Sequence, residues 1–296
     1  MAALVSEPAP KATPAPAPVP EPAPAPGAAP DWQRFAAAAP RAGEGPLIAV
    51  LIDDLGHNAR RVARVIALEP PLTLAFLPYG QALPALTAAA RRAGHEVLMH
   101  LPMEPEDPGQ DPGPGALLTA LDGDEILTRL RWQLGRFEGY VGVNNHMGSR
   151  FTADRAAMTA VMAEVKARGL LYVDSRTTPQ TLGSALARQM GVPEIARDIF
   201  LDDENNAEGV RRQLALLEDT ARRQGFAVAI GHPHPVTLEA LEAWLPAIAG
   251  RGFVLAPVSA VIRRQLSRSS PRAGPSLDQR GVEAFDRRDD RDFNRR

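Results

Sequence analysis

The chain has 296 residues, of which 45% are hydrophobic and 23% charged, and its formal net charge is −2 at pH 7. This composition is ordinary for a soluble globular protein, and the lack of a basic excess argues against a nucleic-acid binder or a protein drawn to anionic membranes. The sequence has no cysteine, which excludes disulfides, thiolate metal ligands and a cysteine nucleophile. No apolar run approaches the ~18 residues that a membrane-spanning helix needs.

Residues 1–44 are predicted to be a disordered linker. Proline and alanine alternate from Glu7 to Pro30, and because proline fixes φ and lacks a backbone donor, this stretch should be an extended spacer. The spacer could tether the domain to an anchor or a partner, or have no role. The start of the chain lacks the basic residues and apolar stretch of a signal peptide, so no export signal is visible.

Residues 45–265 are predicted to form one domain in which helices and strands alternate. Four helix-like segments end at Gly94, Gly169, Gly225 and Gly252, and an apolar strand follows each of them. A glycine after the last helical turn accepts the left-handed conformation that ends a helix. Strands are expected at residues 47–52, 72–77, 96–99, 140–143, 170–173, 195–201, 226–230 and 253–255.

The predicted fold class is α/β. Residues 158–165 and 210–221 carry apolar side chains at helical spacing, so each should present one apolar stripe to a core. Continuous apolar strands that alternate with such helices indicate a parallel sheet covered by helices. Seven or eight of these units favour a closed or nearly closed barrel, with an open doubly wound sheet as the alternative. No glycine-rich phosphate loop follows a strand, which disfavours a nucleotide-binding version of that alternative.

Residues 266–296 are predicted to be a disordered polar tail. They are rich in Arg, Asp, Ser and Gly and contain few apolar residues. Such a segment cannot bury enough surface to offset the entropy lost on ordering.

Polar residues gather at the ends of the predicted strands. In parallel α/β folds, catalytic residues lie at the C-terminal ends of strands. Four of the six histidines occupy such positions, together with several aspartates. One histidine there would be interpreted as a hydrogen-bonded rim residue, but several beside carboxylates indicate a site. These residues are Asp53, Asp54, His100, His146, Asp174, Asp202, Asp203, His232 and His234.

The adjacent carboxylates of Asp53 and Asp54 point to a metal. An aspartate in this position often caps the next helix, but two like charges close together raise one pKa unless a cation neutralises them. Imidazole and carboxylate ligands suit Zn²⁺, and Mn, Fe or Co are also possible. Because successive strand residues point to opposite sides, we expect one aspartate to bind the metal and its neighbour to act as a base.

Four motifs occur in order along the chain: Ile52–Gly56 (IDDLG), Gly94–Glu104 (GHEVLMHLPME), Asn145–Ser149 (NHMGS) and Gly231–His234 (GHPH). They resemble the divergent polysaccharide deacetylase family, whose broader relatives are carbohydrate esterases of the chitooligosaccharide-deacetylase type. The resemblance covers about residues 46–262. It implies a distorted (β/α)7 barrel of the glycoside hydrolase/deacetylase type with one divalent metal.

The resemblance also implies a set of metal ligands. Asp53 matches the family's general base and Asp54 its metal-binding aspartate, and His100 matches a histidine ligand. Four residues after that histidine the broader family has a second one, whereas this chain has Glu104. We expect His146 to take the vacant place, since imidazole preserves the charge of an Asp-His-His site, with Glu104 as the alternative.

The remaining site residues are inferred in the same way. His232 best matches the late-strand histidine that acts as general acid, and His234 is the alternative. Four further residues are expected either to hold substrate or orient ligands, or else to serve only as turn and cap residues. They are Asn145, Ser149, Asp174 and Arg176.

The function that the resemblance implies is removal of N- or O-acetyl groups from a carbohydrate, in the periplasm or cell envelope where such polymers lie. One alternative is a non-catalytic metal-binding or envelope-assembly protein on the same fold, suggested by Glu104 and the proline-rich segment. Another is a metal hydrolase of phosphoesters or cyclic amides, suggested by the His232–Pro233–His234 sequence. Amidohydrolase-type barrels, however, carry their paired histidines on the first strand.

Overall fold

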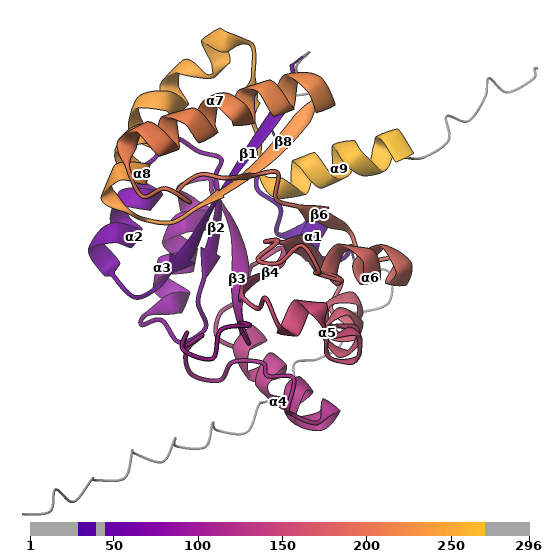
Figure 1. The fold of residues 1–296 in the computed structure, drawn as a ribbon. Coiled ribbons are helices and arrows are strands. Elements are labelled where there is room, and N and C mark those ends of the chain that lie inside the picture. Colours follow the sequence, from indigo (N-terminus) through magenta and orange to yellow (C-terminus); the bar gives the residue numbers. More distant parts are fainter. Residues whose placement is uncertain (1–28, 40–44, 270–296) are drawn as a thin grey trace, which may run out of the picture.

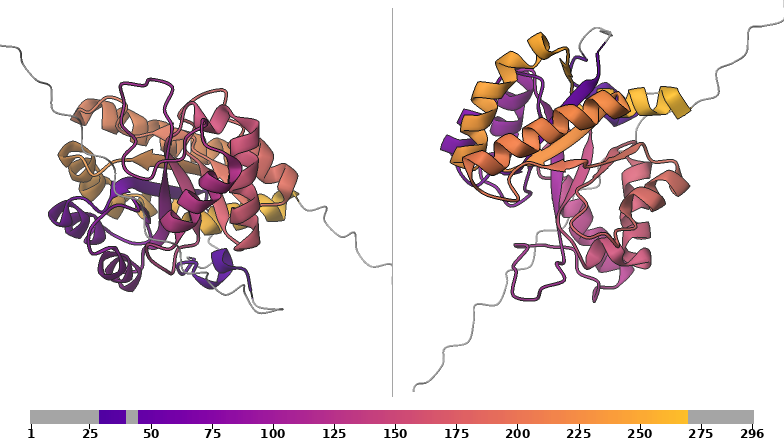
Figure 2. Two further views of the ribbon diagram at one scale, coloured as in Figure 1. Left: turned by 90° about the horizontal axis from the view of Figure 1, so that it is seen from below. Right: turned by 45° about the horizontal axis from the view of Figure 1, so that its top comes forward.

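The computed structural model describes residues 29–39 and 45–269. It shows a curled parallel sheet surrounded by helices (Figure 1), and the two further views in Figure 2 show the helices on the outside of the strands. Most of the predicted linker and nearly all of the predicted C-terminal tail lie outside the described residues.

The observed elements follow the predicted alternation of strands and helices. The strands are β1 (Leu47–Leu55), β2 (Thr73–Phe76), β3 (Glu96–Met103), β4 (Gly142–Met147), β5 (Leu171–Asp174), β6 (Glu194–Ala196), β7 (Ile199–Phe200), β8 (Phe226–Gly231) and β9 (Val254–Leu255). The α-helices are α1 (Asp31–Arg34), α2 (Ala59–Ile66), α3 (Leu83–Arg92), α4 (Gly123–Leu134), α5 (Arg155–Ala167), α6 (Gly183–Met190), α7 (Ala207–Gln224), α8 (Pro235–Trp244) and α9 (Val258–Ser269). Three short 3₁₀ helices are η1 (Phe151–Ala153), η2 (Leu245–Ala247) and η3 (Ala249–Arg251).

The predicted glycine stops are confirmed. Gly94, Gly169, Gly225 and Gly252 all have positive φ, the left-handed conformation that ends a helix. The predicted strand at 195–201 is interrupted and appears as β6 and β7, and β1, β3 and β4 run several residues further than predicted.

The sheet curls until its two ends meet. The hydrogen-bonded strand order is β6-β5-β4-β3-β2-β1-β8-β7, with β9 beside β1, and the pairings are parallel. Only Arg197 and Asp198 separate β6 from β7, although these strands lie at opposite ends of the order. The Arg197 N–H donates to the Asp174 carbonyl on β5 (3.0 Å), and the Asp198 N–H donates to the Val228 carbonyl on β8 (2.9 Å). One stretch of chain therefore bridges both ends, and the sheet is a distorted barrel.

Side chains alternate between the two faces of each strand, which creates two cores. On β1, Ile48, Val50 and Ile52 belong to the core between the sheet and the outer helices. Residues of the other parity fill the barrel interior together with residues of α9, namely Leu47, Ala49, Leu51, Leu98, Val173, Val228, Ile230, Val261 and Ile262. Because the side-chain period of a strand is two, the face of each strand that lines the interior is fixed as long as the strand stays regular.

A short helix that packs on the barrel lies before residue 45. Helix α1 lies inside the predicted linker, and its Trp32 is only 6% exposed because it packs in the interior core. The Trp32 N–H donates to the Gly169 carbonyl (3.1 Å), and the Ala37 N–H donates to buried Glu96 (3.4 Å). At the other end, α9 continues past the predicted boundary at 265.

Candidate metal centre

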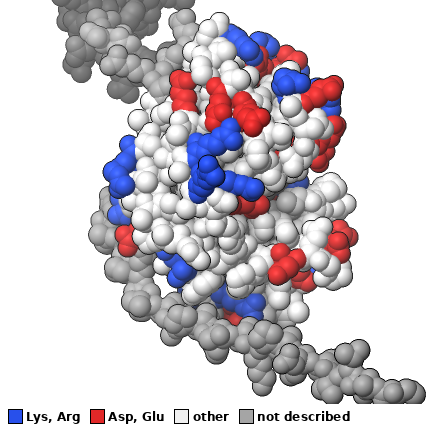
Figure 3. Space-filling model, turned by 90° about the vertical axis from the view of Figure 1, so that its left-hand side faces the viewer, with Lys and Arg blue, Asp and Glu red and all other residues white. Residues whose placement is uncertain are grey.

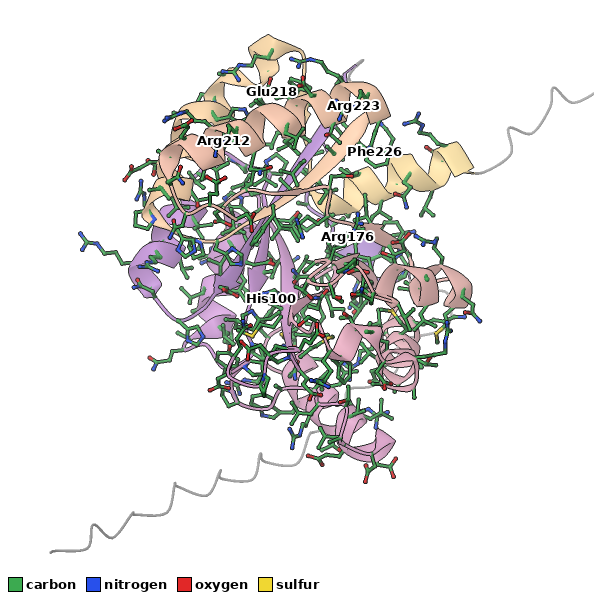
Figure 4. The ribbon with its side chains drawn as sticks, in the orientation of Figure 1. His100, Arg176, Arg212, Glu218, Arg223 and Phe226 are labelled. Atoms are coloured by element: carbon green, nitrogen blue, oxygen red, sulfur yellow. The ribbon has the colours of Figure 1, made fainter. Side chains whose placement is uncertain are left out.

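The interior of the barrel becomes polar where the strands end. Asp53, His100 and His232 each follow an interior apolar residue by two positions, after Leu51, Leu98 and Ile230. They therefore lie on the interior face of β1, of β3 and of the end of β8. Figure 4 shows His100 near the middle of the molecule on β3.

Both aspartates of β1 face this site, contrary to the expected alternation. Asp54 has a left-handed backbone (φ 58°), and the pairing of β1 with β2 shifts register between Ile52 and Leu55. This irregularity returns Asp54 to the side of Asp53. The distances from His100 Nε2 are 3.7 Å to Asp53 Oδ2 and 3.2 Å to Asp54 Oδ1.

Three potential metal ligands converge at Asp54. Its Oδ1 atom lies 3.2 Å from His100 Nε2 and 2.9 Å from His146 Nδ1, and the ligand atoms of the three residues lie within 4.8 Å of one another. Although Asp54 Oδ1 is buried, it has no hydrogen-bond partner. The spacings are close to the roughly 3.3 Å between neighbouring ligand atoms in a tetrahedral site with ligands at about 2.0–2.2 Å.

Asn144 on β4 fixes which nitrogen of His100 faces this cluster. Its side-chain N–H₂ donates to both oxygens of Asp53 at 3.0 Å and to Ser175 Oγ at 3.3 Å. Because a carboxylate only accepts hydrogen bonds, the Asn144 carbonyl must face His100 Nδ1, which lies 2.9 Å away. In the neutral imidazole, His100 Nδ1 is therefore the protonated nitrogen, and Nε2 offers its lone pair toward Asp54.

His232 is held in the same manner by Asp202. Its Nδ1 donates to Asp202 Oδ1 at 3.0 Å, and its backbone N–H donates to Asp202 Oδ2 at 2.7 Å. Thr237 Oγ1 also donates to Asp202 Oδ2 (2.8 Å). Nε2 of His232 is left facing the site, 3.8 Å from Asp54 Oδ2.

Burial and charge give the four groups different proton affinities. Burial raises the pKa of Asp53, and His100 and His232 oppose this only in part. Burial would also raise the pKa of Asp54, but His100 and His146 hold that pKa well below its usual range.

The two histidines are shifted upward. Burial lowers the pKa of His232, but its hydrogen bond to Asp202 and the charge of Asp53 outweigh burial and raise the pKa to about 9. Burial also lowers the pKa of His100, but the carboxylates of Asp53 and Asp54 outweigh this effect, so the pKa of His100 is raised. The site therefore contains a carboxyl with increased affinity for a proton and an imidazole that holds its proton near neutral pH.

Glu104, the alternative ligand, is engaged elsewhere. Its Oε2 accepts hydrogen bonds from both the N–H and the hydroxyl of Thr119 at 2.6 Å, and its Oε1 lies 3.5 Å from Arg150 Nε. It is not part of the group formed by Asp54, His100 and His146.

Two of the predicted supporting residues point away from the site because they have the other strand parity. Asn145 accepts from the Ser175 N–H (3.0 Å) and the Tyr172 hydroxyl (3.3 Å), on the outer side of β5. Asp174 accepts from the Thr181 hydroxyl and the Ser184 N–H, both at 3.0 Å. Both residues hold the loop and helix that follow β5.

The other supporting residues lie at the rim. Ser149 Oγ accepts from the Glu106 N–H (2.7 Å), and Arg176 is exposed with a left-handed backbone (φ 50°). His234 lines a cavity of about 190 Å³ together with Asp54 and His232. His234 also forms a second group with His232 and Asp202 whose ligand atoms lie within 4.8 Å of one another.

Asn144 and Ser175 contact the site but were missing from the predicted set, and Asp202 was named among the strand-end residues without a role. The place of Asp202 at the end of the predicted strand 195–201 was the signal that pointed to it. Asn144 pairs in register with His100 across β3 and β4, and this pairing, which sequence alone does not reveal, distinguishes it from its neighbour Asn145.

The donor set fits a divalent metal. It combines one carboxylate and two imidazoles, which suit zinc and similar ions. The buried, unpartnered Asp54 Oδ1 would otherwise carry the cost of an unsatisfied polar atom.

On the face in Figure 3, acidic and basic side chains of the described residues occur in small mixed groups. In the part of the chain that the structure describes, no helix combines the length and apolar character required to cross a bilayer.

Comparisons with known proteins place these residues in a family context. A family model described as "Divergent polysaccharide deacetylase" matches residues 50–262. The uncharacterized protein YibQ of Escherichia coli K12 is 36% identical over 195 residues, which is 66% of this chain and 61% of YibQ. An uncharacterized protein of Haemophilus influenzae Rd is 33% identical over 198 residues, or 67% of this chain and 70% of that protein. The match to YibQ thus spans less than two thirds of that protein.

Solved structures share the fold. The crystal structure of an uncharacterized protein from Agrobacterium tumefaciens C58 is 31% identical, with a TM-score of 0.77, over 83% of this chain and 98% of that one. A putative cellobiose-phosphate cleavage protein from Enterococcus faecalis V583 is 14% identical with a TM-score of 0.52, over 74% of this chain and 99% of that one. The latter similarity concerns the fold alone.

Proposed function

The chain belongs to the divergent polysaccharide deacetylase family, and we propose that it is a metal-dependent hydrolase that removes N- or O-acetyl groups from a carbohydrate. The observation that carries the proposal is the convergence of Asp54, His100 and His146 on one buried oxygen that has no hydrogen-bond partner. Asp53 and His232 lie beside this cluster, within 4 Å of its members.

The proposed metal is Zn²⁺, and Mn, Fe or Co would accept the same ligands. Asp54, His100 and His146 would hold it. When bound, the ion supplies Lewis-acid polarisation of the scissile carbonyl and makes water more acidic. Asn144 contributes by fixing His100 with Nε2 toward the metal, and Glu104 stays with Thr119.

The chain's own residues divide the proton transfers. Asp53 would accept a proton from the water that attacks the acetyl carbon, since burial raises its proton affinity. His232 would donate its Nε2 proton to the nitrogen or oxygen of the departing sugar as the carbonyl–heteroatom bond breaks. Its Nδ1–H bond to Asp202 stabilises the charged imidazole. Acetate and a free amine or hydroxyl on the sugar are the products.

The substrate class and location follow from the family and are part of the proposal. Polymeric saccharides of the periplasm or cell envelope are the expected substrates. The cavity of about 190 Å³ beside Asp54 and His232 is large enough for an acyl group and a few neighbouring atoms.

The proposal is tested by metal analysis and acetate release on the full chain. Wild type should hold one metal per chain and release acetate from an acetylated saccharide panel. The variants His100→Ala and His146→Ala should lose metal and activity, whereas Glu104→Ala should keep the metal. Asp53→Asn should keep the metal but lose turnover.

Other outcomes would redirect the assignment. If His146→Ala keeps the metal and Glu104→Ala loses it, the third ligand is Glu104 and not His146. Full turnover in Asp53→Asn would remove Asp53 as the base. A folded wild type that binds neither zinc nor manganese would favour the non-catalytic, envelope-assembly function.

A further inference from the structure

The helical cover of the barrel is interrupted between α6 and α7. Every other pair of consecutive strands from β1 to β9 is joined through a helix, but only Arg197 and Asp198 join β6 to β7. Helix α6 packs on α5 and α7 packs on α8, whereas α6 and α7 do not pack closely on each other. The cover over β6 therefore comes from α6, and the gap lies beyond α6, where β6 runs into β7.

A groove of about 500 Å³ occupies this gap. It runs from the loop after β5, where Arg176 lies, past β6 to the start of β8 at Phe226. Figure 4 shows Arg176 and Phe226 on the same side of the molecule, between α7 and α6. The volume is within the roughly 300–1,000 Å³ of small-molecule sites.

The groove contains unsatisfied polar atoms. Among the described residues four buried side-chain atoms lack a hydrogen-bond partner, and two of them, Ser184 Oγ and Glu194 Oε2, belong to residues that line this groove. Glu194 is only 5% exposed, and its other oxygen receives Arg188 Nη1 at 2.8 Å. A buried carboxylate oxygen without a donor is costly, and this cost is located in the wall of the groove.

The lining selects the chemistry of the ligand. Carboxylate and guanidinium groups stand together, as at Glu194 and Arg188, so a ligand must both donate and accept hydrogen bonds, as sugar hydroxyls do. The core of a protein–protein interface is depleted in charged residues, and phosphate-rich nucleic acid would be repelled by Glu194 and Asp198. Phe226 closes the far end of the groove, where it is partly exposed and packs against the interior core.

The groove also begins next to the metal centre. Ser175 Oγ accepts a hydrogen bond from Asn144 in the centre (3.3 Å), and the next residue, Arg176, lines the groove. We propose that this groove is a second carbohydrate-binding site, which holds a part of the polymer remote from the reacting unit. The choice of ligand class rests on the proposed function, whereas the location of the groove does not.

The test is calorimetric titration of the full chain with a four-unit β-1,4-linked oligosaccharide of N-acetylglucosamine. The His100→Ala background prevents turnover. We expect saturable binding that the added pair Arg176→Ala and Ser184→Ala weakens at least tenfold. Arg212→Ala, which changes an exposed arginine of α7 outside the groove, should leave the affinity unchanged.

Ser184→Ala separates binding from folding. Because Ser184 Oγ has no partner, its removal should not lower the melting temperature, so weaker binding by this variant reports the groove. Absence of saturable binding, or equal affinity in the groove and Arg212 variants, would overturn the proposal. Groove binding by a wild type that releases no acetate would instead refute the proposed function and leave the groove proposal standing.

Discussion

Replacing Asn144 by alanine should destabilise the protein in a pH-dependent manner. Asn144 is fully buried and donates two hydrogen bonds to the Asp53 carboxylate, each 3.0 Å long. Hydrogen bonds to charged groups contribute about 1.5–3 kcal/mol each, and Asp53 can recover part of the loss by taking up a proton. We therefore expect a decrease of about 3 kcal/mol in the free energy of unfolding, which is about 6–12 °C in Tm for a domain of this size.

The pH dependence follows from the sign of the linkage. The pKa of Asp53 is already raised by burial, and the Asn144 hydrogen bonds lower it, so their loss raises the folded-state pKa further. A carboxyl with a raised folded-state pKa stabilises the fold below its unfolded pKa, and this contribution is lost as the pH rises through the folded value. The deficit of Asn144→Ala should thus be larger at about pH 8 than at about pH 5.

The assay is urea unfolding of metal-free protein, followed by circular dichroism at both pH values. Asn145→Ala is the matched control, because this neighbouring amide is equally buried but bonds to Met147 at the end of β4 and to Ser175 just after β5 instead of to Asp53. It should lose stability without the added pH dependence. A deficit for Asn144→Ala below about 1 kcal/mol, or one independent of pH, would refute the reasoning.

Three further changes test other parts of the structure. Asp202→Asn removes the charged partner of His232 and should lower its pKa in metal-free protein from about 9 toward the ordinary ~6.5; an ordinary value in wild type, measured by NMR titration, would contradict this. Trp32→Ala should cost about 3 kcal/mol in chemical denaturation, and a loss below about 1 kcal/mol would mean that the α1 segment is not docked. Gly142→Ala would place a Cβ 2.3 Å from the Leu171 carbonyl oxygen and should lower stability by about 2 kcal/mol, whereas unchanged stability would contradict the β4–β5 pairing.

Much of the fold could be predicted because the barrel relies on local signals. Apolar runs mark strands that are buried on both faces, and a glycine marks the end of each helix that precedes Glu96, Leu170, Phe226 and Phe253. The α1 helix was missed because its order depends on Trp32 reaching the interior core. The aromatic residues of the Asp31–Phe35 stretch, which interrupt the proline–alanine pattern, were the available signal.

The site could be predicted in part. Position at strand ends indicated His100, His146 and His232, and the structure brings all three to Asp54. Alternation was the wrong rule for Asp53 and Asp54, because a register shift and a left-handed backbone reorient Asp54. Such an irregularity arises from the pairing of β1 with β2 and leaves no clear trace in the sequence.

The docking of residues 31–37 determines where the N-terminal end of the described segment lies relative to the candidate metal centre. This segment contacts the beginnings of strands, through the Gly169 carbonyl before β5 and Glu96 at the start of β3. His100 lies four residues further along β3, which at about 3.3 Å per residue places the metal cluster about 13 Å away at the opposite pole. The N-terminal end of the described segment therefore lies behind the barrel, on the side away from Asp54, His100 and His146, and it leaves that end of the barrel open.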